Sequence, residues 1–502
     1  MLHELIGGLQ FVFQPYAFLM MAFGVMVGII IGAVPGLSGS IGIILLMPLV
    51  YRMDSNVAMV MLCGLFCGSM FGGSIGAILL NTPGTPSAAA TVLDGHPLAR
   101  KGEAGKAIGV AAISSFVGGI VSTICLILIA PELAKVALKF HAADYFSLAV
   151  FGLTIMASAS GKNMLKGLMS GAVGMLIATV GTDPIVGNSR FTFGSGYLLN
   201  GFNILPVLIG VFAISEVLVT VKSQSADATI QEQNVRNFFP SFKELKGFLW
   251  AAIVGGLMGV FIGIVPGTGG AIACFLAYNV IQRLSKHPER FGQGSLEGLA
   301  AAESSNNGTT GGALIPMLTL GIPGDVVTSV MLGALTLIGV KVGPLLFTNN
   351  PDTVYTIFAG MLIIQFLMLG LGLFYARVAP YVLKISQRIL MPVVMVLCII
   401  GAFTLSNNLY HVYVAMGFGV FGFFMKKYGY PAAPLVLGVI LGPMAEQNLN
   451  RALTLSRNDW SVLVTRPISL SFLILSVALI GIAIYNAAKE AKKNQETTDV
   501  VA

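Results

Sequence analysis

The chain has 502 residues, of which 56% are hydrophobic and 10% charged, with a formal net charge of +7. Soluble domains carry roughly 25% charged residues, so this composition excludes a protein built only from soluble domains and predicts a membrane protein. In a soluble protein, a positive net charge of this size would suggest binding to nucleic acid. Here the basic residues lie in short loops, as the positive-inside rule describes, and we expect no nucleic-acid partner.

Six long stretches without charged residues predict the membrane-embedded segments. They run between residues 5–51, 55–93, 107–131, 247–282, 353–376 and 467–488. A spanning helix needs about 20 apolar residues, so we expect roughly eleven to thirteen embedded segments. Lipid permits only helices or closed barrels, and continuous apolar runs exclude a barrel. The predicted fold class is an all-α, polytopic integral membrane protein. Met1–Gln14 lacks Lys, Arg and a small-residue cleavage site, so no cleaved signal peptide is expected.

Two pairs of similar segments predict an internal repeat. Gly28–Leu45 (GIIIGAVPGLSGSIGIIL) aligns without gaps with Gly259–Leu276 (GVFIGIVPGTGGAIACFL). Further along, Ile78–Gly84 (ILLNTPG) matches Leu318–Gly324 (LTLGIPG), in the same order. We therefore predict one repeat at about 16–130 in a first half (1–240) and another at about 247–360 in a second half (241–502).

Loop charge predicts that the two repeats enter the membrane from opposite faces. No basic residue precedes the first repeat, whereas four precede the second: Lys222, Arg236, Lys243 and Lys246. After the Pro-Gly turn the pattern reverses, with Arg100, Lys101 and Lys106 in the first repeat. Nothing basic lies between Lys341 and Arg377 in the second. This is an inverted-topology repeat, common in secondary transporters, and it makes the basic tail at 487–502 cytoplasmic.

A Pro-Gly motif interrupts an apolar run in each repeat. Proline removes a backbone donor and glycine allows non-helical dihedrals, so we expect a discontinuous helix at both places. Free amides at a half-helix N-terminus suit a carboxylate, and free carbonyls suit a small cation. The candidate binding residues are Pro35, Gly36, Ser38, Gly39, Ser40, Pro266, Gly267, Thr268 and Gly269. The alternative is a kink with small residues for close helix packing; the symmetric pair favours a binding site.

The second pair of segments adds a polar turn at the end of an apolar run. Its residues are Asn81, Thr82, Pro83, Gly84 and Thr85, with Pro323, Gly324 and Asp325 as the counterpart. Closely spaced prolines cannot continue a helix, so we expect a re-entrant tip or a loop at membrane depth. Its amides and hydroxyls could hold a carboxylate or sodium. Asp325 is either a functional intramembrane acid or an ordinary residue of a loop in water.

Polar residues also precede the apolar run that leads to the second turn. Asn306, Asn307 and Thr309 follow Glu303 and offer neutral oxygens for an ion or substrate. The alternative is a helix N-terminal region. Glu216, at the end of another span, fits an interfacial structural role better than ion coupling.

The sequence lacks the common motifs for nucleotides and metals. No P-loop occurs, because the Gly-Lys pairs at residues 105–106 and 161–162 lack the rest of the motif. The five histidines are scattered, and the five cysteines lie in apolar runs, so we expect no metal site and no cofactor. Energy for transport must then come from an ion gradient or another subunit.

Three long strings resemble the large membrane subunit of tripartite tricarboxylate transporters. They are Phe71–Gly109 (FGGSIGAILLNTPGTPSAAATVLDGHPLARKGEAGKAIG), Gly292–Phe347 and Leu441–Trp460. The resemblance implies a bacterial inner membrane, a small four-span membrane subunit, a periplasmic binding protein and cation-coupled uptake of carboxylates, with Na+ as the expected coupling ion. Asp325 and Lys341 stand where we would expect a small and a neutral residue, so citrate is not assumed.

The functional hypothesis is a permease subunit of a binding-protein-dependent secondary transporter. It imports small organic carboxylates of the tricarboxylate or dicarboxylate class by alternating access. The alternative is a carboxylate channel or exporter that works without a binding protein. A membrane enzyme would need intramembrane His, Cys or paired acids, which are scarce here.

Overall fold

The computed structural model describes residues 2–159, 164–183, 187–223, 237–383, 386–404 and 407–501. Within these ranges the chain is helical apart from one short antiparallel hairpin, β1 (Gly181–Thr182) with β2 (Ser189–Arg190). Arg236, one of the four basic residues before the second predicted repeat, lies outside the described residues. The predicted all-α class is confirmed.

The helices of the first half run from α1 to α10. Their bounds are α1 (Leu2–Val12), α2 (Pro15–Ala33), α3 (Gly39–Val50), α4 (Ser55–Leu80), η1 (Pro86–Ala88), α5 (Thr91–Leu98), η2 (Ala99–Glu103), α6 (Ala104–Ala137), α7 (Ala142–Ala159), α8 (Met164–Ala178), η3 (Gly196–Leu198), α9 (Ile204–Leu208), η4 (Ile209–Ile214) and α10 (Ser215–Ser223).

The second half runs from α11 to α21. Its helices are α11 (Phe242–Ile264), α12 (Gly269–Leu284), η5 (Pro288–Arg290), α13 (Leu296–Leu320), α14 (Val326–Leu337), α15 (Leu346–Asn349), α16 (Pro351–Val382), α17 (Gln387–Thr404), α18 (Leu409–Lys427), α19 (Ala432–Leu455), α20 (Val462–Thr465) and α21 (Pro467–Val501).

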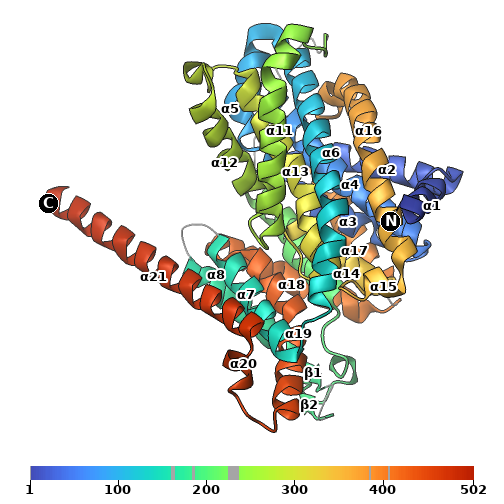
Figure 1. Cartoon of the computed structure of the whole chain (residues 1–502), viewed down its shortest axis with the longest axis vertical. Coiled ribbons are helices and arrows are strands. Elements are labelled where there is room, and N and C mark those ends of the chain that lie inside the picture. Colours follow the sequence, from blue (N-terminus) through green and yellow to red (C-terminus); the bar gives the residue numbers. More distant parts are fainter. Residues whose placement is uncertain are drawn as a thin grey trace.

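Among the described residues, seven helices are long and apolar enough to cross a membrane, and six shorter helices are also apolar. Figure 1 shows α6, α11, α13 and α16 running along the long axis of the molecule. The helices α7, α8, α18 and α19 form a second group beside their lower ends. The expectation of a polytopic membrane protein is therefore met, with seven candidate spans in the described part of the chain.

Helices α2, α4, α6, α11, α13 and α16 form a group that we call the tall group, and both halves of the chain contribute to it. Helix α2 packs on α4, and α11 packs on α13. Helix α6 of the first half packs on α11 and α13 of the second half, and α16 of the second half packs on α2 and α4 of the first. In the same way α3 contacts α14, and α12 contacts η1. Each half thus completes the packing of the other.

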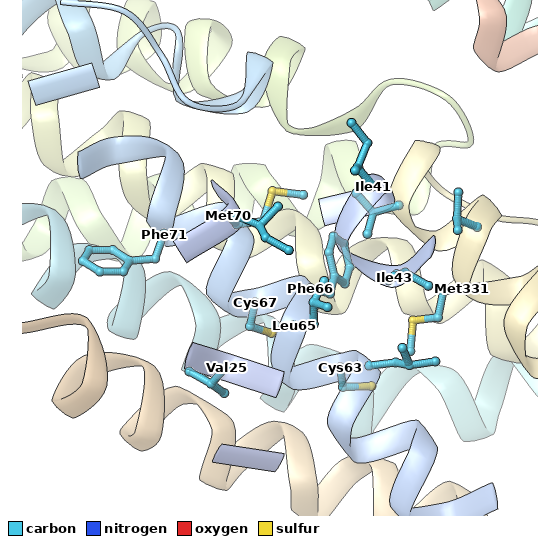
Figure 2. Close-up of a cluster of buried hydrophobic side chains, with 14 of the residues drawn as sticks. Val25, Ile41, Ile43, Cys63, Leu65, Phe66, Cys67, Met70, Phe71 and Met331 are labelled. Carbon is cyan, nitrogen blue, oxygen red and sulfur yellow. The ribbon is translucent and has the colours of Figure 1, made fainter. Parts of the chain in front are cut away.

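A buried apolar cluster stabilises one side of this arrangement. Figure 2 shows Ile41 and Ile43 of α3, Phe66 of α4 and Met331 of α14 within it. Cys63 and Cys67 are fully buried free thiols in the same cluster, so they pack as small apolar side chains.

Glycines make the closest helix crossings possible. A side chain at Gly28 of α2 would meet the backbone of α4, with the Cα of Leu65 and the amide of Ser69 both 2.9 Å away. Gly259 of α11 makes the matching approach to Ser305 of α13. The hydrophobic effect does not drive membrane helices together in lipid, so their association depends on close van der Waals packing. Small residues such as these glycines make that packing possible.

We predict that Gly28→Leu will lower the thermal unfolding midpoint of the protein. Forcing extra methylene groups into packed helices costs about 1–3 kcal/mol or more, and here the obstacle is backbone, which cannot rotate away. The measurement is the thermal unfolding midpoint of detergent-solubilised protein. Gly247→Leu is the matched control, because Gly247 also lies within a helix and nothing lies within 4 Å of its added Cβ. Equal midpoints for the two variants would contradict the prediction.

Candidate functional site

Both Pro-Gly motifs lie between two helices. Helix α2 ends at Ala33 and α3 begins at Gly39, with Gly36 between them at φ +87°. Helix α11 ends at Ile264 and α12 begins at Gly269. Gly267 there has φ +83°, which L-residues rarely adopt, so glycine is needed at both breaks.

The two breaks line a single cavity of about 540 Å³. The first turns of α3 and α12 both contribute to its wall, and these turns carry N–H groups with no carbonyl partner in their own helix. The cavity lies between the tall helix group and the second group, which contributes Met156 of α7, Lys426 of α18 and Ala432 of α19.

Hydroxyl groups at the two breaks differ in what they bind. Ser38 is the N-cap of α3: its Oγ accepts from the amide of Ile41 at 3.5 Å and lies 2.7 Å from Ser40 Oγ. Thr268 instead donates to two carbonyls at the end of α11, those of Ile262 at 2.6 Å and Val265 at 2.8 Å. The serine pair therefore leaves one hydroxyl proton for a ligand, whereas the Thr268 hydroxyl closes the end of its helix.

The two polar turns have the same backbone form. Asn81 ends α4 at φ 57° and Gly321 ends α13 at φ 72°, both left-handed C-caps. The second turn is tied to the break, because the amide of Gly267 donates to the carbonyl of Gly324 at 2.7 Å. In the first turn, the hydroxyls of Thr85 and Ser87 lie 3.0 Å apart at the cavity wall.

Asp325 is a buried helix cap. Its side chain accepts from the amide and the hydroxyl of Thr328, both at 2.7 Å, and the residue is only 6% exposed. The carboxylate thereby satisfies the first turn of α14. Of the two alternatives left open by the sequence, an ordinary loop in water does not fit this burial.

The cavity also contains an ion pair that sequence patterns did not assign to it. Lys426 of α18 pairs with Glu216 of α10, and both line the cavity. Among the described residues on the lining, Lys426 is the one Lys or Arg. Lys426 lies in the last turn of α18, where a basic residue is common for local reasons alone, so no local signal could have assigned it to this site.

The structure brings eleven of the sequence-predicted residues to the cavity lining. These are Gly36, Ser38, Gly39, Ser40, Pro83, Gly84, Thr85, Gly267, Thr268, Gly269 and Asp325. The lining also includes Ser69, Ser87 and Phe212, which sequence reasoning missed because α4, η1 and η4 reach the cavity only through tertiary packing.

Nine predicted residues do not line the cavity: Pro35, Asn81, Thr82, Pro266, Asn306, Asn307, Thr309, Pro323 and Gly324. Asn81 and Thr82 are exposed at the turn. Asn306 and Thr309 are buried directly behind the wall, because a Cβ on Gly270 would lie 3.0 Å from Asn306 Oδ1 and 3.5 Å from Thr309 Oγ1.

A second cavity, of about 850 Å³, lies on the other side of the second turn. Gly321, at the start of this turn, lines the second cavity, and Asp325, at its end, lines the first. The lining carries Lys341 with the amide side chains of Asn200 and Asn448, and no acid among its described residues.

Comparison with known proteins gives the family. Residues 18–437 match the family described as the tripartite tricarboxylate transporter TctA family. An uncharacterized 52.8 kDa protein in the TAR-I ttuC' 3' region of Agrobacterium vitis is 38% identical over 461 residues, covering 92% of each chain. An uncharacterized protein in the TAR-II ttuC' 3' region of the same organism is 37% identical over 237 residues, covering 47% of this chain and 98% of the relative. No solved structure matches.

The match covers the Pro-Gly breaks, both turns and Lys426, which together build the cavity. The chain therefore belongs to the tripartite tricarboxylate transporter TctA family, and it is the large, multi-pass membrane subunit of such a transporter rather than an enzyme.

Proposed function

We propose that the chain is the permease subunit of a binding-protein-dependent secondary transporter that imports small organic carboxylates of the tricarboxylate or dicarboxylate class. It works with a small four-span membrane subunit and a periplasmic binding protein, in a bacterial inner membrane. The observation that carries the proposal is the single cavity where two helix breaks, two polar turns and Lys426 meet.

The chemistry of this lining suits a small polyanion. The first turns of α3 and α12 offer backbone N–H groups and the positive ends of helix dipoles. Ser38 and Ser40 add hydroxyl donors, and Lys426 adds a full positive charge once it leaves Glu216. Because an unpaired anion is costly to bury, a coupling cation, with Na+ as the first choice, must accompany the carboxylate.

Equivalent contacts in the two halves support an inverted repeat with re-entrant elements. A Cβ on Gly84 would meet the carbonyl of Gly32, and a Cβ on Gly324 would meet the carbonyl of Gly263. In the alignment of the two repeats, Gly32 and Gly263 are partners, as are Gly84 and Gly324. The same backbone contact thus recurs in both halves. Together with the reversed loop charges, this supports repeats of opposite orientation.

The two cavities suggest how access alternates. They lie on either side of the turn that joins α13 to α14. A movement of this turn and of its counterpart after α4 would close one cavity and open the other. Carboxylates would enter through the cavity with Lys341 and leave through the cavity with Lys426, as alternating access requires.

The serine pair provides the direct test. We expect the double variant Ser38→Ala, Ser40→Ala to raise the KM for carboxylate uptake about tenfold or more, because hydrogen bonds to a charged ligand contribute ~1.5–3 kcal/mol. Uptake is measured in membrane vesicles with a periplasmic extract added. The control is Ser471→Ala, an exposed serine of α21 that bonds only its own helix carbonyl at 2.7 Å.

Normal uptake by the serine variant at equal protein amount would rule out this binding site. Equal uptake with and without the periplasmic extract would instead favour the channel or exporter, which needs no binding protein.

A further inference from the structure

Glu303 is a fully buried acid in the first half of α13, and the substrate site described above does not use it. Its two carboxylate oxygens accept from the hydroxyls of Thr91 and Ser115, the second at 3.1 Å. In the part of the chain that the structure describes, no ion pair includes Glu303.

This environment does not support a bare negative charge. Two neutral hydroxyls orient a carboxylate but do not neutralise it, and an ionised acid inside a membrane protein without a counter-charge is very costly. The group must therefore hold one positive charge, either a proton or a monovalent metal ion. A residue that served packing alone would not need an ionisable group at this place.

Glu303 lies one helical turn behind the cavity wall. Ser87 lines the cavity, and four residues later Thr91 donates to Glu303. On α13, Asn306 is three residues from Glu303 and faces the wall at Gly270. Its Nδ2 donates to the carbonyl of Met70 at 3.0 Å, but its Oδ1 is buried without a donor. An unsatisfied oxygen therefore stands between the cavity and the acid.

We propose that Glu303, with the hydroxyls of Thr91 and Ser115, binds the monovalent coupling cation, which reaches it from the cavity past Asn306. This proposal rests on the transport function proposed above, and it identifies the residues that bind the coupling ion in that transport. The three groups come from α5, α6 and α13, so the charge on one carboxyl affects the packing between both halves of the chain. An empty site leaves an uncompensated charge there, which penalises movement without the ion.

Other titratable side chains lie near this site without forming an ion pair with it. Cys274 is a buried thiol of α12, a helix that packs on α13. Asp94 on α5 is engaged elsewhere: it accepts from the hydroxyl of Tyr278 at 2.9 Å and from the amides of Gly294 and Ser295. Asp94 is thus held by three donors, two of them backbone amides, whereas Glu303 has only the two hydroxyls.

The test compares wild type and Glu303→Gln in vesicles that contain the complete transporter. We expect gradient-driven accumulation of labelled carboxylate to fall about tenfold, because the neutral amide no longer needs the ion. Exchange of labelled for unlabelled carboxylate at equal ion concentrations should persist.

Two separate experiments identify the cation. One applies a Na+ gradient at constant pH, and the other applies a proton gradient without Na+. The cation is the one whose gradient no longer drives accumulation in the variant. Glu297→Gln is the control: it lies on the same helix, where Trp250 Nε1 donates to its side chain at 3.4 Å.

A milder variant covers the case in which Glu303→Gln does not fold. Ser115→Ala removes one proposed ligand and should raise the cation concentration for half-maximal uptake several-fold, with little change in the thermal unfolding midpoint. Wild-type accumulation and an unchanged cation requirement in these variants would overturn the inference. The proposed function itself would fail separately, if wild-type vesicles showed no carboxylate exchange at all.

Discussion

Lys426→Gln is expected to reduce the efficiency of carboxylate uptake, measured as kcat/KM, by about tenfold to hundredfold. A hydrogen bond between a charged group and its ligand contributes ~1.5–3 kcal/mol, which corresponds to that factor. Lys426 is the one basic side chain among the described residues of the lining, so no other lysine or arginine there can replace its charge. Uptake is measured in vesicles at equal amounts of folded protein.

Two further variants separate ligand binding from general charge effects. Lys427→Gln removes the neighbouring positive charge, whose ammonium group lies 5.4 Å from the ring of Tyr428 and not on the cavity lining, and it should transport normally. Glu216→Gln frees Lys426 from its ion pair, so the KM should fall. A loss of uptake in Lys427→Gln equal to that in Lys426→Gln would show that the cavity charge has no special role.

Gly267→Ala is expected to abolish uptake and lower stability. The residue has φ +83°, where an L-residue costs ~1–2 kcal/mol. The added Cβ would also lie 2.7 Å from the Cα of Met156, so α7 would have to move. That shift would disturb the hydrogen bond from the Gly267 amide to Gly324, which connects the helix break to the turn. Uptake and the thermal unfolding midpoint are both measured.

Gly292→Ala is the matched control for backbone strain. Gly292 has φ +79°, but nothing lies within 4 Å of an added Cβ, and it does not line the cavity. This variant should lose about 1 kcal/mol of stability and keep its uptake. If Gly267→Ala also transports normally, the coupling between the break and the turn is not needed for transport.

Much of this molecule follows from local sequence. A low share of charged residues and long apolar runs require membrane helices, because exposed backbone polar groups are not tolerated in lipid. Pro-Gly pairs at residues 35–36 and 266–267 interrupt those runs for reasons of local geometry alone. Of the polar turn in the first half, Pro83, Gly84 and Thr85 reach the cavity, whereas Asn81 and Thr82, equally polar in sequence, face outward. Residue type alone could not separate them.

By itself, then, the sequence determined the class of protein, the family resemblance and the positions where helices break, because these depend on composition and on neighbouring residues. Only the tertiary structure decided which groups meet: it joined Lys426 to Glu216, and it buried Glu303 between Thr91 and Ser115. Those partners lie about two hundred residues apart. Contacts over such distances depend on how whole helices pack, and no pattern of neighbouring residues specifies that.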